Sequence, residues 1–392
     1  MAIDKKLGYY LCDGIEFESK IHACMHSNNA QKPVDWIFND LAFQSHNWEV
    51  EPIDSLDELY NQRARDLREK YDYLILSYSG GADSHNILMA FLRQGLLIDE
   101  LLINTLEKGW KKFTVIDPNN KSSVNNGAEH YLQTLPRLKE LENQLPRTKI
   151  TICDLTDFVS KGLLDSGDAS WILNKREALN PIGITRFNYI YFDEVRKRFD
   201  KHKKIGLILG VEKPKSLIQN GDFYIRFNDR SANMVTIINH FTDYDNTTLE
   251  FFYWSPDAVP ILIKQGHVIK QWLEVNPVFQ QYWHSNMTTY KEVRYWHEKL
   301  LRSVVYPSTW NDDWFQVDKA VKDWYSEFDH WFIEGYKNTR EHHIWSEGVE
   351  FVKNNLKNFL RNDDDSSEPD GLKLFVKKYK IGKMKVLSDG SV

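Results

Sequence analysis

Cysteine is scarce in this chain of 392 residues, which has three, at Cys12, Cys24 and Cys153. They form no close pair, and their spacing is not that of a zinc ribbon or of a disulfide framework. The sequence therefore argues against a fold held together by metal or by disulfides. Cys153 follows an apolar stretch, where a lone cysteine is more often a small buried residue than a nucleophile.

Long hydrophobic runs and an excess of positive charge are also missing. No stretch approaches the roughly 18 apolar residues that a membrane helix needs, and the opening MAIDKKLGYYLCDG lacks the apolar segment of a secretion signal. The formal net charge of −6 argues against a protein that coats nucleic acid by charge alone. We expect a soluble, cytoplasmic protein with no membrane partner.

Material for a core is abundant, with 42% hydrophobic and 14% aromatic residues. A chain of this length exceeds one compact core of ordinary size, so more than one domain is expected. Changes of composition along the chain predict an N-terminal cap (1–54), an α/β domain (55–254), a helical substrate-side domain (255–360), and an acidic linker with a Lys-rich tail (361–392).

Short Ile- and Leu-rich stretches alternate with helical periodicity in the predicted α/β domain. Strands are expected near 73–76, 98–105, 148–155 and 204–210, with helices before the first and between the others. GDFYIRFND and LEFFYWSP could add strands at the edge of the sheet. Such alternation predicts an α/β fold whose parallel sheet has helices on both faces.

The region after Ser255 has a different pattern. SPDAVPILIKQGHVIKQWLE begins with a capping serine followed by proline, and helical periodicity recurs to about residue 360. Its Trp residues at helical spacing are expected to be core rather than a binding platform. The final LKLFVKKYKIGKMKVLSDGSV carries six lysines. It could be a strand docked on another subunit or an RNA contact.

The stretch DYLILSYSGGADSHNILMAFLRQG, residues 72–95, joins a predicted strand to a predicted helix through two glycines. Consecutive glycines allow close approach of a ligand to the backbone, and free N–H groups at a helix N-terminus favour an anion such as phosphate. The loop has no lysine, so it is not a Walker A motif, and it lacks the three-glycine dinucleotide spacing. Asp83 beside a phosphate indicates a shared cation, for which Mg²⁺ is the natural candidate. A tight turn without a ligand is the structural alternative, although it does not require this combination of residues.

The segment from Ser79 to Ser84, SGGADS, resembles the SGGxDS signature of the PP-loop family, the N-type ATP pyrophosphatases. The resemblance covers about residues 55–255. It is nearest in kind to the synthetase domain of asparagine synthetase, but without its glutaminase, because Met1 is followed by Ala2 and not by a nucleophilic cysteine. Three scattered cysteines also do not fit the four-cysteine zinc site of the deazaguanine synthases.

The resemblance implies that ATP is the nucleotide and that its α phosphorus is attacked by an oxygen of the substrate, with release of pyrophosphate. An amine or a sulfur nucleophile then displaces AMP. It further implies that the loop cradles the pyrophosphate, with Mg²⁺ on Asp83, and that the adenine ring rests at the end of the second strand. The implied ATP-binding residues are Ser77, Ser79, Gly80, Gly81, Asp83, Ser84, Ile103, Asn104 and Gly210.

The fourth predicted strand ends in LGVEKPKS, where the family places a further loop on the phosphate or magnesium side. Lys213 and Lys215 could neutralise the leaving pyrophosphate, and we predict catalytic roles for both together with Asp83. A solvated charged turn is the alternative. Arg186 and Arg226 could bind a phosphate or an acidic substrate, although ordinary ion pairs are the more common use of arginine.

The leading hypothesis is an adenylating ligase, similar to amidotransferases, that activates a carboxylate or carbonyl oxygen for attack by an amine. A second hypothesis is modification of a tRNA or DNA base by the same chemistry, supported by the Lys-rich tail and by RKRFDKHKK at 196–204. A third is a nucleotide-binding module without catalysis. The acceptor, small molecule or nucleic acid, is not identified by any local pattern, and a homo-oligomer is possible.

Overall fold

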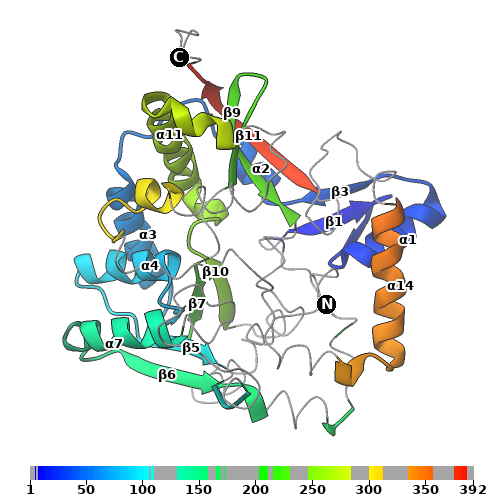
Figure 1. The fold of residues 1–392 in the computed structure, drawn as a ribbon, viewed down its shortest axis with the longest axis horizontal. Coiled ribbons are helices and arrows are strands. Elements are labelled where there is room, and N and C mark those ends of the chain that lie inside the picture. Colours follow the sequence, from blue (N-terminus) through cyan, green and yellow to red (C-terminus); the bar gives the residue numbers. More distant parts are fainter. Residues whose placement is uncertain are drawn as a thin grey trace.

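The computed structural model describes most of the chain, and the ribbon in Figure 1 follows these parts from the N-terminus to the C-terminus. The described residues are 5, 8–105, 107–109, 130–157, 165–167, 169, 172, 203–210, 215–229, 246–283, 300–311, 334–355 and 375–385.

A five-stranded parallel sheet forms the centre of the fold and confirms the predicted α/β class. The order of its strands is β10-β7-β4-β5-β6. When the five strands are numbered 1 to 5 as they occur along the chain, their order in the sheet, starting from β6, is 3-2-1-4-5. The second and third strands extend the sheet to one side of β4 and the last two extend it to the other side, so the strand order reverses between β4 and β7. The strands are β4 (Tyr73–Ser77), β5 (Glu100–Thr105), β6 (Lys149–Asp154), β7 (Ile205–Leu209) and β10 (Thr247–Phe251).

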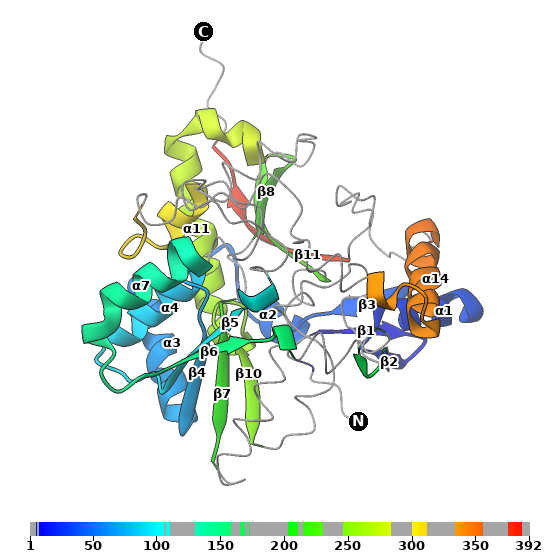
Figure 2. The same ribbon diagram turned by 60° about the horizontal axis from the view of Figure 1, so that its bottom comes forward.

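Helices α3 (Leu56–Lys70), α4 (Ala82–Arg93) and α7 (Leu135–Leu141) lie together on one side of this sheet (Figures 1 and 2). Helix α3 begins with a complete capping box, in which Ser55 and Glu58 satisfy each other's backbone N–H groups. Ser55 is thus the N-cap of the helix that the sequence predicts before the first strand. A five-residue π-helix, His130–Thr134, leads into α7.

The N-terminal residues, which the sequence pattern did not assign, form a small antiparallel sheet with two helices. The strand order is β2-β1-β3, and α1 follows β2 with Ser19 as its cap. Helix α14 (Arg340–Asn355) packs on α1, where Gly348 leaves room for the side chain of Ile21. The bounds are β1 (Tyr9–Cys12), β2 (Ile15–Phe17), α1 (Lys20–Ala30), β3 (Val34–Ile37) and α2 (Asp40–Gln44).

A third sheet, of order β11-β9-β8, joins the Lys-rich tail to the middle of the chain. Its strands are antiparallel: β8 (Lys215–Gln219), β9 (Asp222–Asn228) and β11 (Val376–Lys383). Of the two stretches expected at the edge of the main sheet, LEFFYWSP supplies β10, whereas GDFYIRFND lies in this separate sheet. The reason is that β9 forms a tight hairpin with β8 through Asn220 and Gly221, both at positive φ.

The Lys-rich tail is therefore a strand docked on its own chain. Two of its lysines form ion pairs, Lys377 with Asp40 at 2.8 Å and Lys380 with Asp222 at 3.1 Å. These contacts leave less free positive charge for a nucleic-acid contact than the sequence alone indicates. The other basic stretch, at 196–204, is described only from residue 203.

Aromatic side chains connect the three sheets. Trp254, fully buried just after β10, packs edge to face on Phe227 of β9, and Trp48 stacks on Tyr379 of β11 at 4.3 Å between ring centroids. Ser255 Oγ accepts a hydrogen bond from the Asp257 amide and so caps the 3-10 turn Pro256–Ala258, which leads into α11 (Val259–Val275). Of the tryptophans described after Ser255, Trp283 is buried, and Trp272, Trp310 and Trp345 are partly buried against the core. The division of the chain into four segments stays a prediction, and the helix expected between the third and fourth predicted strands lies outside the described residues.

Within the described part of the chain, no helix combines the length and the apolar character that crossing a membrane requires.

Candidate functional site

The loop from Tyr78 to Gly81 leaves the carboxyl end of β4 and leads directly into α4. In open α/β sheets, ligands collect at the carboxyl ends of the strands where the strand order reverses, and β4 and β7 are the two strands at that point. Gly210, which follows β7, lies against the first turn of α4, since a Cβ on it would be 3.2 Å from the Ser84 amide nitrogen. The structure thus places Gly210 beside the loop.

The first turn of α4 presents backbone N–H groups. Gly81 is the N-cap residue and has no side chain to cap the helix. The amides of Ala82, Asp83 and Ser84 precede the first N–H that is bonded within the turn, that of His85, which donates to the Gly81 carbonyl at 2.9 Å. Three donors therefore converge at one helix end, where the helix dipole also favours an anion.

Two serine hydroxyls hold the loop in shape. Ser84 Oγ accepts from the Ser79 amide at 3.3 Å and donates to the Gly81 carbonyl at 3.2 Å. Ser79 Oγ accepts from the Gly81 amide at 3.3 Å. The loop is thus already curved around its own hydroxyl groups, which lowers the conformational cost of ordering it around a ligand.

Gly80 is required by two features of the loop. Its φ is +73°, and a Cβ there would lie 2.7 Å from the Cα of Thr134 in the π-helix. Thr134 Oγ1 donates to the Ser79 carbonyl at 2.6 Å, and Arg137 Nε donates to the Gly80 carbonyl at 3.1 Å. The segment between β5 and β6 therefore fixes the back of the loop.

Tyr78 and His85, one on each side of the loop, form a buried pair behind it. The Tyr78 hydroxyl lies 3.2 Å from His85 Nδ1, and His85 is 2% exposed. Burial, together with the nearby Arg137 guanidinium, lowers the pKa of His85 to about 4, and burial raises the pKa of Tyr78. His85 is therefore neutral at pH 7 and serves the packing of the loop.

Asp83 is contacted by residues far along the chain. Its Oδ1 accepts from the Tyr306 hydroxyl at 2.7 Å, its Oδ2 lies 3.6 Å from Arg302 Nη2, and its carbonyl accepts from the Tyr253 hydroxyl at 2.9 Å. Burial raises the pKa of both tyrosines well above its ordinary value, and the Asp83 carboxylate adds to the effect. Both phenols therefore stay protonated donors.

A short hydrogen-bonded chain anchors the segment that carries Arg302 and Tyr306. Asn86 Nδ2 donates to the Tyr253 hydroxyl at 3.0 Å, and Thr309 Oγ1 donates to Asn86 Oδ1 at 2.9 Å. Residues 300–305 are helical, and Tyr60 donates to the carbonyl of Val305 at 2.7 Å. The predicted helical domain thus supplies a guanidinium at a loop that has no cation of its own.

The end of β5 carries buried polar atoms near the position predicted for adenine. Ile103 is buried and Asn104 half-buried, and the Asn104 Oδ1 and Thr105 Oγ1 atoms are buried without a hydrogen-bond partner among the described residues. Cys153 lies beside Asn104 in the ladder and is half-buried. Unsatisfied polar atoms at a strand end are suited to recognise a ligand.

The remaining predicted residues are placed differently. Ser77 ends β4. Lys215 begins β8 and lies opposite Arg226 of β9, in a sheet other than the one that carries the loop. Lys213 and Arg186 lie outside the described residues.

Four neighbours of the loop were not predicted from the sequence: Arg302, Tyr306, Tyr253 and Arg137. Tyr306 is 223 positions from Asp83. Arg302 stands in a helical pattern with no local signature, so nothing in the sequence marks it. The deep burial of Tyr253 in the aromatic run FFYW was predictable, but its hydrogen bond to Asp83 was not.

No cluster of three or more His, Cys, Asp or Glu side chains in the described part of the chain could hold a metal by itself. Asp83 is a single carboxylate beside a candidate phosphate site. This arrangement fits Mg²⁺ that arrives with a nucleotide, because Mg²⁺ is usually bound by one or two carboxylates and by phosphate oxygens.

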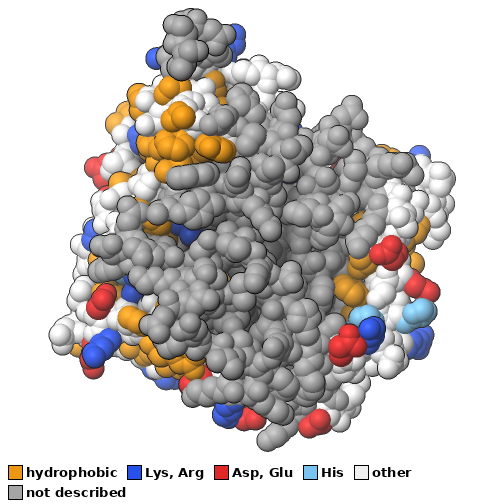
Figure 3. Space-filling view, viewed as in Figure 1, with side chains coloured by type: hydrophobic (Ala, Val, Ile, Leu, Met, Phe, Trp, Pro, Cys, Tyr) orange, Lys and Arg blue, Asp and Glu red, His pale blue; other side chains and the backbone are white. Residues whose placement is uncertain are grey.

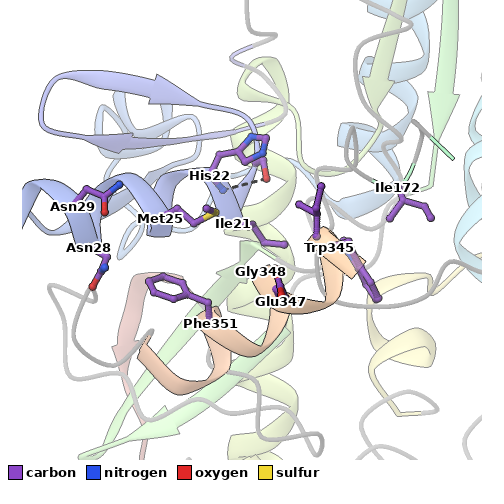
Figure 4. A pocket seen from close by; sticks show the side chains of 12 residues that line it. Ile21, His22, Met25, Asn28, Asn29, Ile172, Trp345, Glu347, Gly348 and Phe351 are labelled. Carbon is purple, nitrogen blue, oxygen red and sulfur yellow. Dashed lines mark hydrogen bonds between the residues drawn. The ribbon is translucent and has the colours of Figure 1, made fainter. Parts of the chain in front are cut away.

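A concavity of about 360 Å³ lies between α1 and α14 (Figure 4). Ile21, Met25 and Phe351 contribute apolar walls, and Asn28 and Asn29 lie at one end. None of the residues predicted as a site lines it, so the loop at β4 remains the candidate site.

No family model matches the chain, and no match is found among curated proteins or among solved structures.

Proposed function

We propose that the protein binds ATP at residues 79–84 and transfers the AMP moiety to a carboxylate or carbonyl oxygen of an acceptor. The acceptor oxygen forms a bond to the α phosphorus, and the bond from that phosphorus to the bridging oxygen breaks, releasing pyrophosphate. An amine then displaces AMP from the activated acceptor. The observation that carries the proposal is the uncapped N-terminus of α4, behind an SGGADS loop, at the reversal of strand order.

The β and γ phosphates would bind the N–H groups of the first turn of α4 and the hydroxyls of Ser79 and Ser84. Gly80 and Gly81 present no side chain, so that a phosphate oxygen can reach the backbone. The dipole of α4 adds a favourable term that is concentrated at this end of the helix.

Arg302 would neutralise charge on the leaving pyrophosphate. Arg302 lies at the loop. Its side chain is 25% exposed, and the side chain of Asp83 is 19% exposed. The pair is long, at 3.6 Å, so both groups can turn towards a triphosphate. Lys213, which lies outside the described residues, remains a candidate for the same task, whereas Lys215 begins β8 in another sheet.

Mg²⁺, when bound with the nucleotide, would shield the phosphate oxygens and make the α phosphorus a better electrophile. Asp83 would hold it, and Tyr306 would orient the carboxylate by its hydrogen bond to Oδ1. At the other end of the nucleotide, Asn104 and Thr105 would offer their buried polar atoms to the adenine ring, next to Ile103.

The test is a product analysis with ATP labelled at the α and γ positions, in the presence of pools of carboxylates and amines or of RNA and DNA. The proposal predicts labelled AMP and pyrophosphate in equal amounts. ADP with orthophosphate, and no pyrophosphate, would rule out this cleavage. The pool that supports turnover also decides between a small-molecule acceptor and a nucleic acid.

Asp83→Asn provides the variant for that assay. It keeps the shape of the side chain and its capacity to accept from Tyr306, but it removes the charge for Mg²⁺. Turnover should fall at least about 100-fold, the order seen when one preorganised electrostatic contact is lost. Asp72→Asn, at the opposite end of β4, is the matched control and should retain turnover.

One observation favours a second function, a nucleotide-binding module without catalysis. The Asp83 carboxylate already faces a guanidinium and a phenol, and these contacts compete with a metal ion. ATP binding of the same strength with and without Mg²⁺, together with no turnover in any pool, would support this reading over the ligase.

A further inference from the structure

The two edges of the five-stranded sheet differ in how well they are covered. At one edge, β10 is almost entirely buried. At the other, β6 has Ile150 and Ile152 exposed to 41% and 48%. These two isoleucines are two positions apart, so they lie on the same face of the strand.

The exposed isoleucines continue a buried apolar row across the sheet. Ile150 pairs with Leu101 and Ile152 with Ile103 in the β5–β6 ladder, and both β5 residues are buried. The row stops at β6 with its last two members in solvent. Apolar side chains also surface on the lower left of the molecule, in the region of α7 and β6 (Figure 3).

The backbone of β6 is available for pairing at alternate residues. Lys149 donates to the Asp99 carbonyl and Leu155 to the Thr105 carbonyl, so the odd-numbered residues face β5. In a parallel ladder, the backbone N–H and C=O groups of the even-numbered residues between them point away from the neighbouring strand. For Ile150 and Ile152, no partner for these outward groups lies within the described part of the chain.

We propose that β6 is the dimerisation strand of this protein, and that it pairs antiparallel with β6 of a second copy about a two-fold axis. In this arrangement the side chains of β6 are complementary to those of the same strand in the second copy. Ile150 faces Ile152 of the second copy, and Ile152 faces Ile150 of the second copy. In both pairs the backbones are hydrogen-bonded to each other, and the four isoleucines form one apolar cluster that joins the two buried rows.

The register follows from the same side chains. A shift of two residues in one direction would place Ile150 against Asp154 of the second copy, and a shift in the other direction would place Ile152 against Thr148, which lies outside β6. In the preferred register, Thr151 faces Thr151 of the second copy in a non-hydrogen-bonded pair, where the Cα atoms are about 4.5 Å apart. An exposed edge strand with apolar side chains pairs readily, and its charged flanks, Lys149 and Asp154, lie at its ends.

Sedimentation velocity of the full chain from 1 to about 50 μM, a range that covers micromolar dissociation constants, tests the proposal. We expect a reversible dimer, and Ile152→Lys should raise its dissociation constant at least about tenfold, since one such change acts on both strands. Ile53→Lys, at a fully exposed isoleucine outside the sheet, is the matched control and should leave the dimer intact. Because position 152 is exposed, the thermal midpoint of the Lys variant should stay close to the wild type. A wild-type monomer throughout this range, or a dimer unchanged by Ile152→Lys, would overturn the proposal.

Cross-linking tests the register. Thr151→Cys should give a covalent dimer under mild oxidation, with the two introduced thiols bonded to each other, as peptide mapping would report. A non-hydrogen-bonded antiparallel pair has the Cα separation that a disulfide needs. A bond from the introduced thiol to Cys153 of the second copy would contradict this register.

Discussion

Two ion pairs in this molecule show the difference between a carboxylate buried in the core and one that solvent can reach. Lys20 and Asp229 lie 2.6 Å apart, with side chains 2% and 1% exposed. Arg302 and Asp83 lie 3.6 Å apart and are 25% and 19% exposed. The first pair is closed to solvent and the second is open to it.

The surroundings of the two acids add to the contrast. Asp229 also accepts from the Tyr10 hydroxyl at 2.8 Å and from the Phe375 amide at 3.1 Å, so it ties the N-terminal unit, β9 and the start of β11 together. Asp83 lies in the first turn of α4, beside N–H groups that have no cap. A carboxylate with an accessible face and a long ion pair can exchange partners, whereas Asp229 cannot do so without unfolding its neighbours.

Lys20→Met should have the largest effect, because it leaves a buried carboxylate without its cation. Removing one partner of a buried pair typically costs about 3–5 kcal/mol of unfolding free energy. Urea denaturation at pH 7 would measure it. Lys5→Met, which removes the exposed pair with Glu16, is the matched control and should leave the midpoint unchanged. Equal midpoints for the two variants would show that the buried pair does not hold the fold.

Gly80→Ala should come next, through strain and a clash in the loop. A side chain at φ +73° costs about 1–2 kcal/mol, and the Cβ would also meet the backbone of Thr134 at 2.7 Å. We expect a stability loss of about 2–4 kcal/mol and a weakened affinity for ATP, measured by denaturation and by calorimetry.

Gly14→Ala separates these two contributions. Gly14 has φ +79°, and a Cβ at this position would have no other atom within 4 Å, so the variant should show the strain alone. If both variants lose the same stability and both bind ATP as the wild type does, the close approach of the loop to Thr134 has no role.

His85 predicts a loss of stability in acid. Its folded pKa of about 4 is below the ordinary 6.5, so the unfolded chain binds more protons as the pH falls from 6.5 towards 4. Stability should therefore drop across this window, by up to about 2 kcal/mol at pH 5. His85→Gln should flatten the change of urea midpoint between pH 7 and pH 5, and His46→Gln, at an exposed histidine, is the control. A slope that persists in His85→Gln would assign the effect to other groups.

Arg302→Gln should have the smallest effect on stability and a selective effect on binding. Because the pair with Asp83 is long and partly exposed, its removal should leave the denaturation midpoint close to the wild type. The affinity for pyrophosphate should fall about tenfold, about 1.4 kcal/mol, while the affinity for adenosine stays the same. Arg65→Gln on α3 is the control, and calorimetric titration is the measurement. Undiminished pyrophosphate binding would remove Arg302 from the site.

The parts of the fold that were predictable are those specified by neighbours in sequence. The apolar run at β4, the glycines after it and the helical periodicity of α4 lie within about two dozen residues, and each follows from local conformational preference. Ser55 and Ser255 mark helix starts for the same reason.

The parts that were not predictable depend on contacts between distant segments. The short strands β1 and β2 carry little periodicity, and the pairing of β11 with β9 joins residues about 150 positions apart in sequence. The position of Arg302 beside Asp83 has the same origin. The sequence therefore located the loop but not the side chains that the rest of the chain brings to it.

Residues 79–84 are proposed to hold the β and γ phosphates of ATP. The most direct test is a crystal structure with Mg²⁺ and the α,β-methylene analogue of ATP, in which the bond expected to break cannot be cleaved. We predict phosphate oxygens within hydrogen-bond distance of the Ala82, Asp83 and Ser84 amides, with the Arg302 guanidinium turned from Asp83 towards them. A nucleotide bound elsewhere, with Arg302 still on Asp83 and the first turn of α4 free of phosphate, would contradict this claim.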